Sequence, residues 1–229
     1  MTSEPSVYYQ HSGKVPIASR ISYTVRRKVF DYFMETMQPT EHDRILDIGV
    51  TSDSTYRESN FFEKFYPHTS QIVCVGTENG AHLEKEYAGL RFIQVKPNEP
   101  LPFADKEFDI GFSNAVIEHV GNTEAQKRFL REACRVARKV FITTPNRWFP
   151  VEHHTSVPLL HYLPKPLYRR ILARTALHYW SHEQNLNALT LGEFKACFPP
   201  DYPIAVEYIG VGWGFLRSNL VAYTSGDVS

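Results

Sequence analysis

Four residues stand where they can carry ligand chemistry. Asp47 and Gly49 close the apolar run "RILDIG", and Glu78 follows the next apolar run, "QIVCVG". A carboxylate offers acceptors that match the two adjacent donors of a ribose diol. His119, in "AVIEHV", has the residue type that removes a proton from a hydroxyl near neutral pH. These types and positions indicate a ligand site with acid–base chemistry beside it.

The elements that position these residues alternate between buried strands and helices. Short apolar runs bounded by turn residues predict strands at 44–49, 71–76, 91–95, 108–114 and 140–144. Helical spacing of apolar residues predicts helices at 17–37, 60–66, 82–89, 123–138 and 167–178. This alternation requires a parallel sheet covered on both faces, an α/β fold of the Rossmann-like kind. Two strand candidates within 205–224 flank a Gly-rich turn and predict an antiparallel pair at the sheet edge.

Composition narrows the class of protein. The 229 residues are 42% hydrophobic and 22% charged, and 25 basic side chains balance 25 acidic ones. A net charge of zero argues against a nucleic-acid binder held by bulk electrostatics. No apolar run approaches the roughly 20 residues that span a bilayer, and the first residues lack a signal-peptide core. The three cysteines show no metal-ligand spacing, so we expect a cytoplasmic protein.

The turn after the first strand departs from the dinucleotide-binding pattern. That pattern needs three glycines, but Thr51 and Ser54 occupy the second and third positions. A pyrophosphate cofactor, and with it a nicotinamide oxidoreductase, is therefore disfavoured. S-adenosylmethionine, which carries no phosphate, tolerates a looser loop: Asp47 can attract its ammonium, and amides near Gly49 and Thr51 can meet its carboxylate. The other interpretation is that Asp47 only caps the loop and Gly49 only allows the turn.

Four stretches carry a family resemblance: "ILDIGVTSD", "VCVGTEN", "LPFADKEFDIGFSNAVIEHV" and "FLREACRVARKVFITTPN". In order and spacing they resemble the class I S-adenosylmethionine-dependent methyltransferases, and most closely the small-molecule branch related to ubiquinone-type enzymes. The resemblance covers 44–146. It implies a seven-stranded sheet with a reversed C-terminal hairpin. It also implies that Asp47 and Gly49 hold the methionine end of the cofactor and that Glu78 holds the ribose.

Other cofactor contacts are less like the family. An Asp after the third strand usually binds the adenine amino group, but Lys96 and Asn98 lie near that place. Asn98 can accept through its side-chain oxygen, whereas Lys96 cannot accept. We therefore assign Asn98 to the adenine and Thr51 to the altered loop. Ser113 and Asn114, at the end of the fourth strand, are further candidates for contact with cofactor or acceptor.

Three histidines are candidates for catalysis. His119 follows the fourth strand, and His153 with His154 follows the fifth. Each can serve as a general base, but each can also be a structural residue that packs its loop. Glu152 and His161 raise the question of a metal. Because adjacent residues of an extended chain point in opposite directions, one ion would rarely bind both neighbouring histidines, and we expect no metal.

The segment 147–185 differs in character from the sheet. Its aromatic residues Trp148, Phe149 and Trp180 can wall an apolar acceptor pocket. A basic cluster suits an anionic membrane surface or a lipid-linked acceptor, but equally a cover helix or a dimer face; it comprises Lys165, Arg169, Arg170 and Arg174.

We expect one domain in four parts. An N-terminal helical lid (1–40, with Tyr8 and Tyr9 before its helix) precedes the cofactor-binding core (41–146), the acceptor-side insertion (147–185) and the edge strands (186–229).

Two functions of different class follow from these patterns. The leading one is an S-adenosylmethionine-dependent methyltransferase whose partner is a small-molecule or carrier- or lipid-linked acceptor, methylated at oxygen. The alternative is a non-catalytic methyltransferase-like module that binds a protein partner. The altered glycine loop and the missing Asp that usually binds the adenine amino group support this alternative. The oligomeric state stays open.

Overall fold

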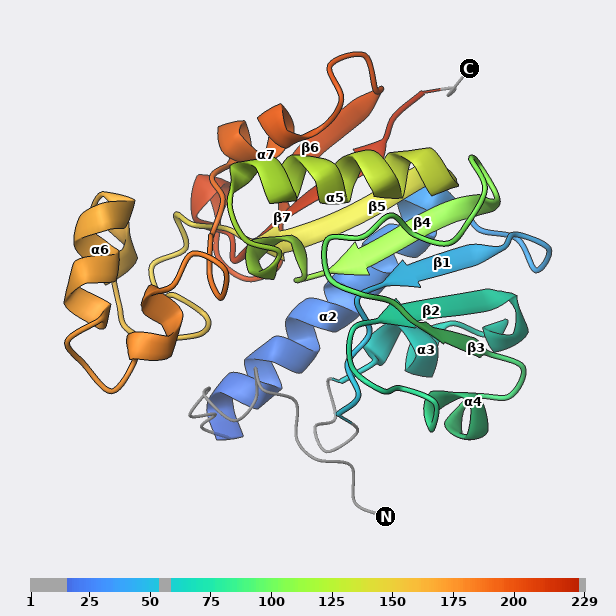
Figure 1. The fold of residues 1–229 in the computed structure, drawn as a ribbon, viewed down its shortest axis with the longest axis horizontal. Coiled ribbons are helices and arrows are strands. Elements are labelled where there is room, and N and C mark those ends of the chain that lie inside the picture. Colours follow the sequence, from blue (N-terminus) through green and yellow to red (C-terminus); the bar gives the residue numbers. More distant parts are fainter. Residues whose placement is uncertain (1–15, 54–58, 227–229) are drawn as a thin grey trace.

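The computed structural model describes residues 16–53 and 59–226. In this part of the chain seven strands form one sheet in the order β3-β2-β1-β4-β5-β7-β6 (Figure 1). The strands are β1 (Ile45–Ile48), β2 (Ile72–Gly76), β3 (Arg91–Gln94), β4 (Phe108–Asn114), β5 (Ala137–Pro145), β6 (Ile204–Ile209) and β7 (Asn219–Thr224). β7 runs antiparallel to both of its neighbours, and the other pairings are parallel. The predicted α/β sheet and its antiparallel C-terminal pair are confirmed.

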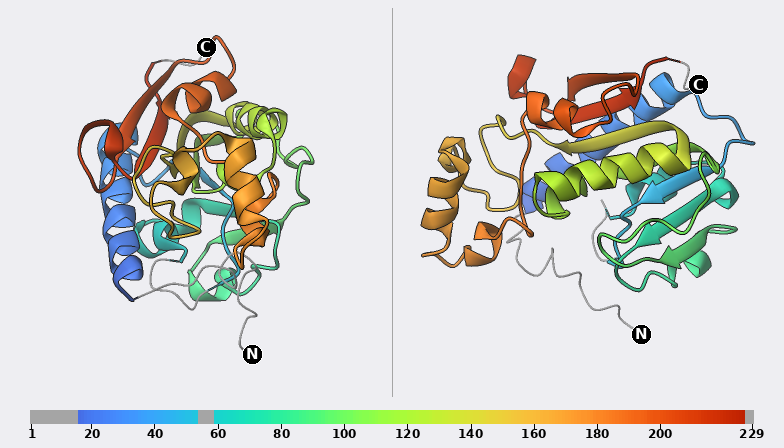
Figure 2. Two further views of the ribbon diagram at one scale, coloured as in Figure 1. Left: turned by 90° about the vertical axis from the view of Figure 1, so that its left-hand side faces the viewer. Right: turned by 45° about the horizontal axis from the view of Figure 1, so that its top comes forward.

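Helices cover both faces of this sheet. α5 (Thr123–Val136) and α7 (Leu191–Cys197) lie on one face, and α2 (Pro16–Met37) and α3 (Phe61–Phe65) lie on the other (Figures 1 and 2). α4 (Leu83–Glu86) follows β2. α6 (Lys165–Leu172) stands apart from the sheet, beyond the carboxyl ends of the strands, with the 3₁₀ turns Leu160–Tyr162 and His178–Ser181 (Figure 2).

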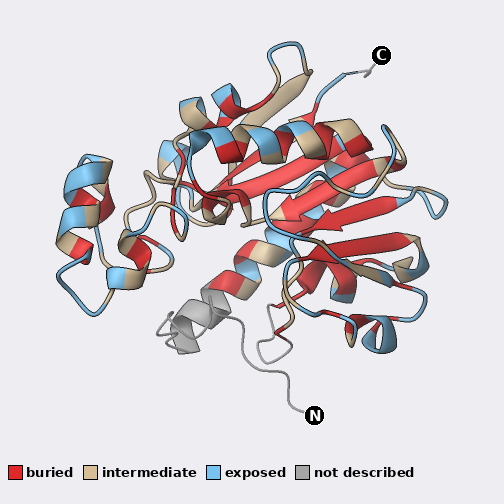
Figure 3. Cartoon of the chain, viewed as in Figure 1, coloured by how far each residue is buried: buried red, intermediate tan, exposed pale blue. Residues whose placement is uncertain are grey.

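Two hydrophobic cores sandwich the sheet, and alternation along each strand decides which residue enters which core. In β1, Ile45 packs with α2 and α3, whereas its neighbour Leu46 packs with α5 and α7. The same alternation separates Phe141 from Ile142 in β5. Because successive side chains of a strand point to opposite faces, the central strands are buried on both sides (Figure 3).

Two predicted helix ends were wrong for reasons that the structure shows, and one helix was not predicted. The helix predicted over 123–138 ends at Val136, because Ala137 turns to extended backbone and already pairs with Phe108 of β4. The helix predicted over 167–178 ends at Leu172, whose carbonyl accepts a hydrogen bond from Thr175 Oγ1. α7 was not predicted at all.

The expected N-terminal lid is largely a core helix. Val29 and Phe33 of α2 are fully buried beneath the sheet. Only nearer its start, at Ser22, Val25 and Arg26, does the described part of the helix reach the cavity described below. The expected contribution of Tyr8 and Tyr9 lies outside the described residues.

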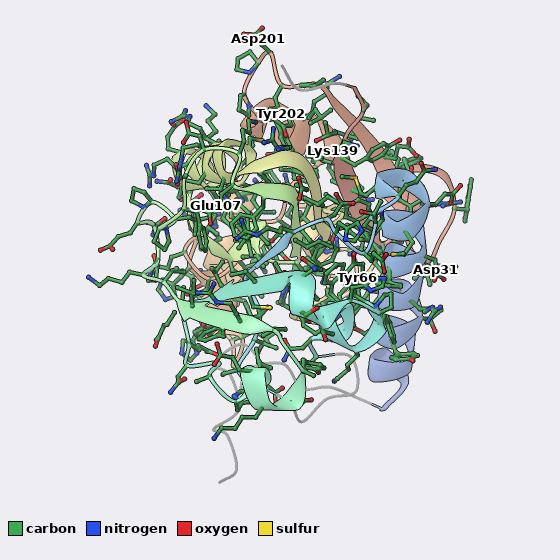
Figure 4. The ribbon with its side chains drawn as sticks, turned by 90° about the vertical axis from the view of Figure 1, so that its right-hand side faces the viewer. Asp31, Tyr66, Glu107, Lys139, Asp201 and Tyr202 are labelled. Carbon is green, nitrogen blue, oxygen red and sulfur yellow. The ribbon has the colours of Figure 1, made fainter. Side chains whose placement is uncertain are left out.

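The opposite, amino-terminal edge of the sheet carries a different set of side chains. Figure 4 looks onto this edge and shows Glu107, Lys139 and Tyr202 there. Tyr202 donates a hydrogen bond to the carbonyl of Arg138, which ties the loop before β6 to β5. Within the described ranges, none of the helices combines the length and the apolar character needed to cross a bilayer.

Candidate active site

A cavity of about 970 Å³ opens at the carboxyl ends of the central strands. It lies where the strand order reverses between β1 and β4, the place at which open α/β sheets bind ligands. Its volume is at the upper end of the roughly 300–1,000 Å³ typical of small-molecule pockets, so it suits a cofactor together with an acceptor. Its lining includes Asp47, Gly49, Thr51, Glu78, Asn98, Asn114, His119, Phe149, His153 and His154.

The turn after β1 requires a glycine. Gly49 has φ of +99°, and a Cβ there would lie 2.4 Å from a methyl carbon of Val116. The amides of this turn do not match the expectation that they meet a carboxylate. The amide of Gly49 donates to the carbonyl of Val75 at 2.8 Å, and the amide of Thr51 donates to Asn60 Oδ1 at 3.3 Å. These hydrogen bonds join the turn to β2 and to Asn60, the residue before α3, so the two amides are not available to a ligand.

Asp47 lies against a second carboxyl group. Its place in β1 points its side chain to the α2–α3 face, where Glu63 of α3 and Cys74 of β2 meet it within 4.8 Å. Cys74 Sγ donates to Glu63 Oε1 at 3.2 Å. Burial raises the pKa of Asp47 well above its usual range, and the neighbouring charge of Glu63 adds to the effect. Asp47 therefore takes up a proton more readily than an exposed carboxyl group does.

The loops after β1 and β2 are joined by a short hydrogen bond. Ser52 Oγ donates to Glu78 Oε2 at 2.6 Å. This bond places the Glu78 carboxylate at the cavity wall, where the sequence predicted an acceptor for a diol. Asn98 lines the same cavity from the loop after β3, with a left-handed backbone at φ of +63°. Lys96 pairs with Glu99 at 3.5 Å on the surface.

Of the two candidates at the end of β4, only Asn114 lines the cavity. Ser113 is fully buried and absent from the cavity lining, and its hydroxyl donates to the carbonyl of Ile48 at 2.7 Å. It joins β4 to β1, so its assignment to the cofactor is corrected to a structural role. Asn114 does line the cavity, and its Oδ1 accepts from Thr143 Oγ1 at 2.7 Å.

A chain of hydrogen bonds runs through two of the predicted histidines. Nδ1 of His119 lies 2.7 Å from the carbonyl of Asn185, so Nδ1 carries the proton and Nε2 presents a lone pair. Nε2 of His154 lies 3.1 Å from that nitrogen, and Nδ1 of His154 lies 2.8 Å from Glu152 Oε1. His154 therefore donates through both nitrogens, toward the Glu152 carboxylate and toward His119.

The carboxylate of Glu152 is unusually well held. It also accepts the amides of His154 and Thr155. Burial alone would raise the pKa of Glu152, but the charge of His154 and these hydrogen bonds hold it well below its usual range. Burial lowers the pKa of His119 to about 3, and the adjacent His154 charge contributes, so His119 is neutral. The neutral imidazole of His119 thus contacts the ion pair formed by His154 and Glu152.

A second acid lies beneath His119. Glu118 is fully buried, and its Oε1 lies 3.8 Å from Nε2 of His119. Its Oε2 accepts from Thr144 Oγ1 at 3.0 Å, whereas Oε1 has no hydrogen-bond partner. Burial raises the pKa of Glu118 to about 7, although the nearby His154 charge opposes the shift. An oxygen without a partner at this depth calls for an explanation.

Buried amides hold the turn that carries His119. Gln126 of α5 donates from Nε2 to the carbonyls of Ile117 and Asn187. The amide of Asn187 donates to the carbonyl of Glu118 at 2.7 Å, and Asn187 Nδ2 donates to Gly121. The 185–187 segment is thereby fixed to the 117–121 turn, which brings the Asn185 carbonyl to His119.

The remaining predicted residues are not all gathered here. His153 is exposed at the cavity rim, and its ring packs edge-on against His154 with centroids 5.5 Å apart. Nε2 of His161 donates to the carbonyl of Phe149 at 2.8 Å, away from the histidine pair. Of the predicted aromatic wall, Phe149 lines the cavity, but Trp148 does not, and the buried Trp180 packs against His154 instead.

Sequence reasoning missed three contributors. Glu118 immediately precedes His119 in "IEHV", and an acid at that spacing from a catalytic candidate was the signal. Glu63 lies in a short aromatic helix that gives no such signal. The carbonyl of Asn185 acts through the backbone, and its contact with His119 spans 66 residues of sequence. Tertiary structure alone brings these last two to the site.

Comparison with known proteins agrees with this geometry. A protein-family model described as "Methyltransferase domain" matches residues 53–140, which begin just after the altered glycine turn and include β2 to β4, the histidine turn and α5. Over these residues the chain is similar to methyltransferase domains, which supports an S-adenosylmethionine-dependent methyltransferase. A search of curated proteins gives no match.

Solved structures share the fold at low identity. A Pyrococcus horikoshii protein is 16% identical, with a TM-score of 0.57, 96% of this chain covered and 97% of the other. A SAM-dependent methyltransferase of Aquifex aeolicus is 13% identical, with a TM-score of 0.54 and coverages of 96% and 97%. The complex between the Haloferax volcanii Trm112 methyltransferase activator and its methyltransferase partner gives 12% identity, a TM-score of 0.55 and coverages of 90% and 92%.

S-adenosylmethionine, the cofactor of such methyltransferases, fits the residues of this chain. Gly49 leaves the turn after β1 without a side chain, because a Cβ there would collide with Val116. Glu78 and Asp47 both place carboxyl groups at the cavity wall. The amides of Gly49 and Thr51 are bonded within the protein and are not free to hold a phosphate, which suits a phosphate-free ligand.

Proposed function

We propose that this methyltransferase methylates a hydroxyl oxygen of a small-molecule or carrier-linked acceptor. The observation that carries the proposal is the pair of ring nitrogens, Nε2 of His119 and Nε2 of His154, which lie 3.1 Å apart beside the cavity. Their side chains keep 12% and 10% of their surface exposed, so the pair can be reached from the cavity. An oxygen acceptor needs such a group because its proton must leave.

On this proposal each sequence-predicted cofactor residue except Ser113 has a role. Asp47 and Gly49 hold the methionine end, Glu78 accepts hydrogen bonds from the ribose hydroxyls, and the Asn98 side chain receives the adenine amino group. Thr51 and Asn114 complete the wall between these contacts. When bound, S-adenosylmethionine supplies an electrophilic methyl group; the protein's own contribution is to orient the acceptor and exclude water.

The histidines act on the acceptor side. His119 takes up the proton of the reacting oxygen on Nε2, and the protonated His154 stabilises the negative charge that develops on that oxygen. Glu152 and the carbonyl of Asn185 hold the two rings in position. His153, exposed at the rim, contacts a more distant part of the acceptor.

The surface around α6 supports a carrier- or lipid-linked acceptor. Leu159 and Leu167 are 55% and 43% exposed, and Arg170 and Arg174 are exposed beside them. Two other basic residues of the predicted cluster are used internally, since Lys165 pairs with Glu193 and Arg169 pairs with Glu183. A smaller amphipathic patch remains, which suits transient contact with an anionic interface in the cytoplasm.

Titration calorimetry with S-adenosylmethionine and a methyl-transfer assay on hydroxylated acceptors test the proposal. The wild-type protein should bind the cofactor, and Asp47→Ala should weaken its affinity at least tenfold, about 1.4 kcal/mol. Transfer to amine-bearing analogues alone would refute oxygen methylation. The absence of any cofactor binding would favour a partner-binding module instead.

A further inference from the structure

We propose that Glu118, His119 and His154 bind a divalent first-row transition-metal ion. The inference rests on the proposed function and deepens it, because it states how the histidine pair activates the acceptor oxygen. The three side chains come from two segments, the turn after β4 and the loop after β5, and offer one ligand atom each.

The spacing of the ligand atoms is close to that of a metal centre. Nε2 of His119 lies 3.1 Å from Nε2 of His154 and 3.8 Å from Oε1 of Glu118, and all three atoms lie within 4.8 Å of one another. Ligands at about 2.1 Å from one ion are roughly 3.0–3.4 Å apart. A small inward movement of the Glu118 carboxylate therefore completes the set.

The outer partners of the histidines are those that orient metal ligands. A ligating histidine commonly donates its other ring N–H to a carboxylate or a backbone carbonyl. Nδ1 of His154 faces Glu152 Oε1 at 2.8 Å, and Nδ1 of His119 faces the carbonyl of Asn185 at 2.7 Å. Both Nε2 atoms are thereby turned toward the same point, and the metal ion would replace the proton that lies between them, which is released to solvent.

The carboxylate of Glu118 supplies an independent observation. Its Oε1 is buried, has no hydrogen-bond partner and lies nearest the histidine pair, whereas Thr144 fixes Oε2. Leaving a carboxylate oxygen without a partner in the interior costs free energy that a bound cation would offset. The orphaned oxygen is therefore explained as a metal ligand.

Charge and access agree with this assignment. Two carboxylates, Glu118 and Glu152, lie at the site with the two imidazoles, which are residue types that hold divalent cations. The imidazoles border the cavity and Glu118 does not, which leaves the open coordination positions on the cavity side. Three protein ligands with an open position are typical of catalytic metal sites, where a bound hydroxyl loses its proton to solvent more readily. Imidazole ligands favour transition metals over Mg²⁺ and Ca²⁺.

The sequence argument against a metal concerned the adjacent histidines His153 and His154. The structure agrees that these two do not converge: His154 turns inward to His119, and His153 is exposed. The partner of His154 lies 35 residues earlier in the chain, so adjacency does not exclude the site.

Cobalt titration tests the site directly. Protein stripped with chelator is titrated with Co²⁺, and the visible absorption of the bound ion reports nitrogen and carboxylate ligation. Wild type and the matched control His153→Ala should bind Co²⁺ alike, whereas His154→Ala and Glu118→Gln should bind it at least tenfold more weakly. Mg²⁺ should not compete. Thermal unfolding without metal checks that each variant folds. If His154→Ala does not fold, Glu118→Gln is the decisive variant, because Gln keeps an acceptor for Thr144.

Equal Co²⁺ affinity in all variants, or no ligand-field absorption with wild type, would overturn the metal site. The failures of the two proposals are distinguishable. A protein that binds S-adenosylmethionine and methylates a hydroxyl equally well after chelation overturns the metal alone. Co²⁺ binding that follows the expected pattern supports the site even if no hydroxyl is methylated.

Discussion

Ser52 Oγ donates a hydrogen bond of 2.6 Å to Glu78 Oε2 and so couples the loop after β1 to the loop after β2. Those two loops would hold the methionine end and the ribose of the cofactor. The bond therefore sets the distance between the contacts to the methionine end and those to the ribose, without the glycine-rich loop that the family usually has.

The Glu78 carboxylate should matter for cofactor affinity. Glu78→Ala removes both diol acceptors and the partner of Ser52, so we expect S-adenosylmethionine to bind at least tenfold more weakly, a loss of about 1.4 kcal/mol. Calorimetric titration measures the change. Glu41→Ala, on an exposed loop far from the cavity, serves as the control. Wild-type affinity in Glu78→Ala would remove this residue from the site.

The buried carboxyl of Asp47 should make stability depend on pH. Its pKa in the folded state is raised above the unfolded value of roughly 3.9. Its contribution to stability is therefore complete below that unfolded pKa and is lost as the pH rises through the folded pKa. Asp47→Asn carries no titrating group, so its free energy of unfolding relative to wild type should increase with pH.

Urea unfolding of both proteins at about pH 5 and about pH 8 measures this difference. A difference that is the same at both pH values would show that Asp47 keeps its charge when folded.

His119 should separate chemistry from cofactor binding. His119→Ala removes one of the two nitrogens that meet the acceptor oxygen, so turnover should fall about a hundredfold or more. The affinity for S-adenosylmethionine should stay at the wild-type value. Single-turnover kinetics and calorimetry measure the two quantities, with the exposed His42→Ala as control. An unchanged rate would return His119 to a purely structural role.

Gln126 should contribute to stability through its two buried hydrogen bonds. Gln126→Met keeps the volume but leaves the carbonyls of Ile117 and Asn187 without this donor. We expect a loss of about 1–3 kcal/mol in the free energy of unfolding. Lys127→Ala, on the same helix, breaks only a partly exposed ion pair with Glu124 and should change stability by less than about 0.5 kcal/mol. Comparable losses in both variants would contradict the role given to Gln126.

The sheet could be predicted from sequence because its signals are local. β4, Phe108–Asn114, was predicted with its observed bounds, since an apolar run between turn residues identifies a buried strand. α7 was missed although Thr190 and Glu193 form a capping box, a local signal that was available. The boundary between α5 and β5 was wrong because the pairing of Ala137 with Phe108 overrides the helical pattern.

The candidate site was only partly accessible from sequence. His119 and His154 were recognised as chemical groups, but their contact joins residues 35 positions apart, and nothing local specifies it. Ser113 is of a residue type that often contacts ligands. Its position in β4 buries its side chain, whose hydroxyl donates a hydrogen bond to the carbonyl of Ile48. Residue type alone therefore identifies candidates. The face of the strand to which a side chain points, and the conformation of the loops, decide which candidates reach the cavity.

The two-sided burial of β1 also limits how this chain can change. Deleting one residue before Asp47 would exchange the faces of the strand, placing the acid among the aliphatic side chains near α5 and Ile48 opposite Glu63. A change in the length of this short segment would thus abolish folding and ligand binding together. We expect insertions and deletions in related sequences to occur elsewhere, for instance in the surface connections beyond β5.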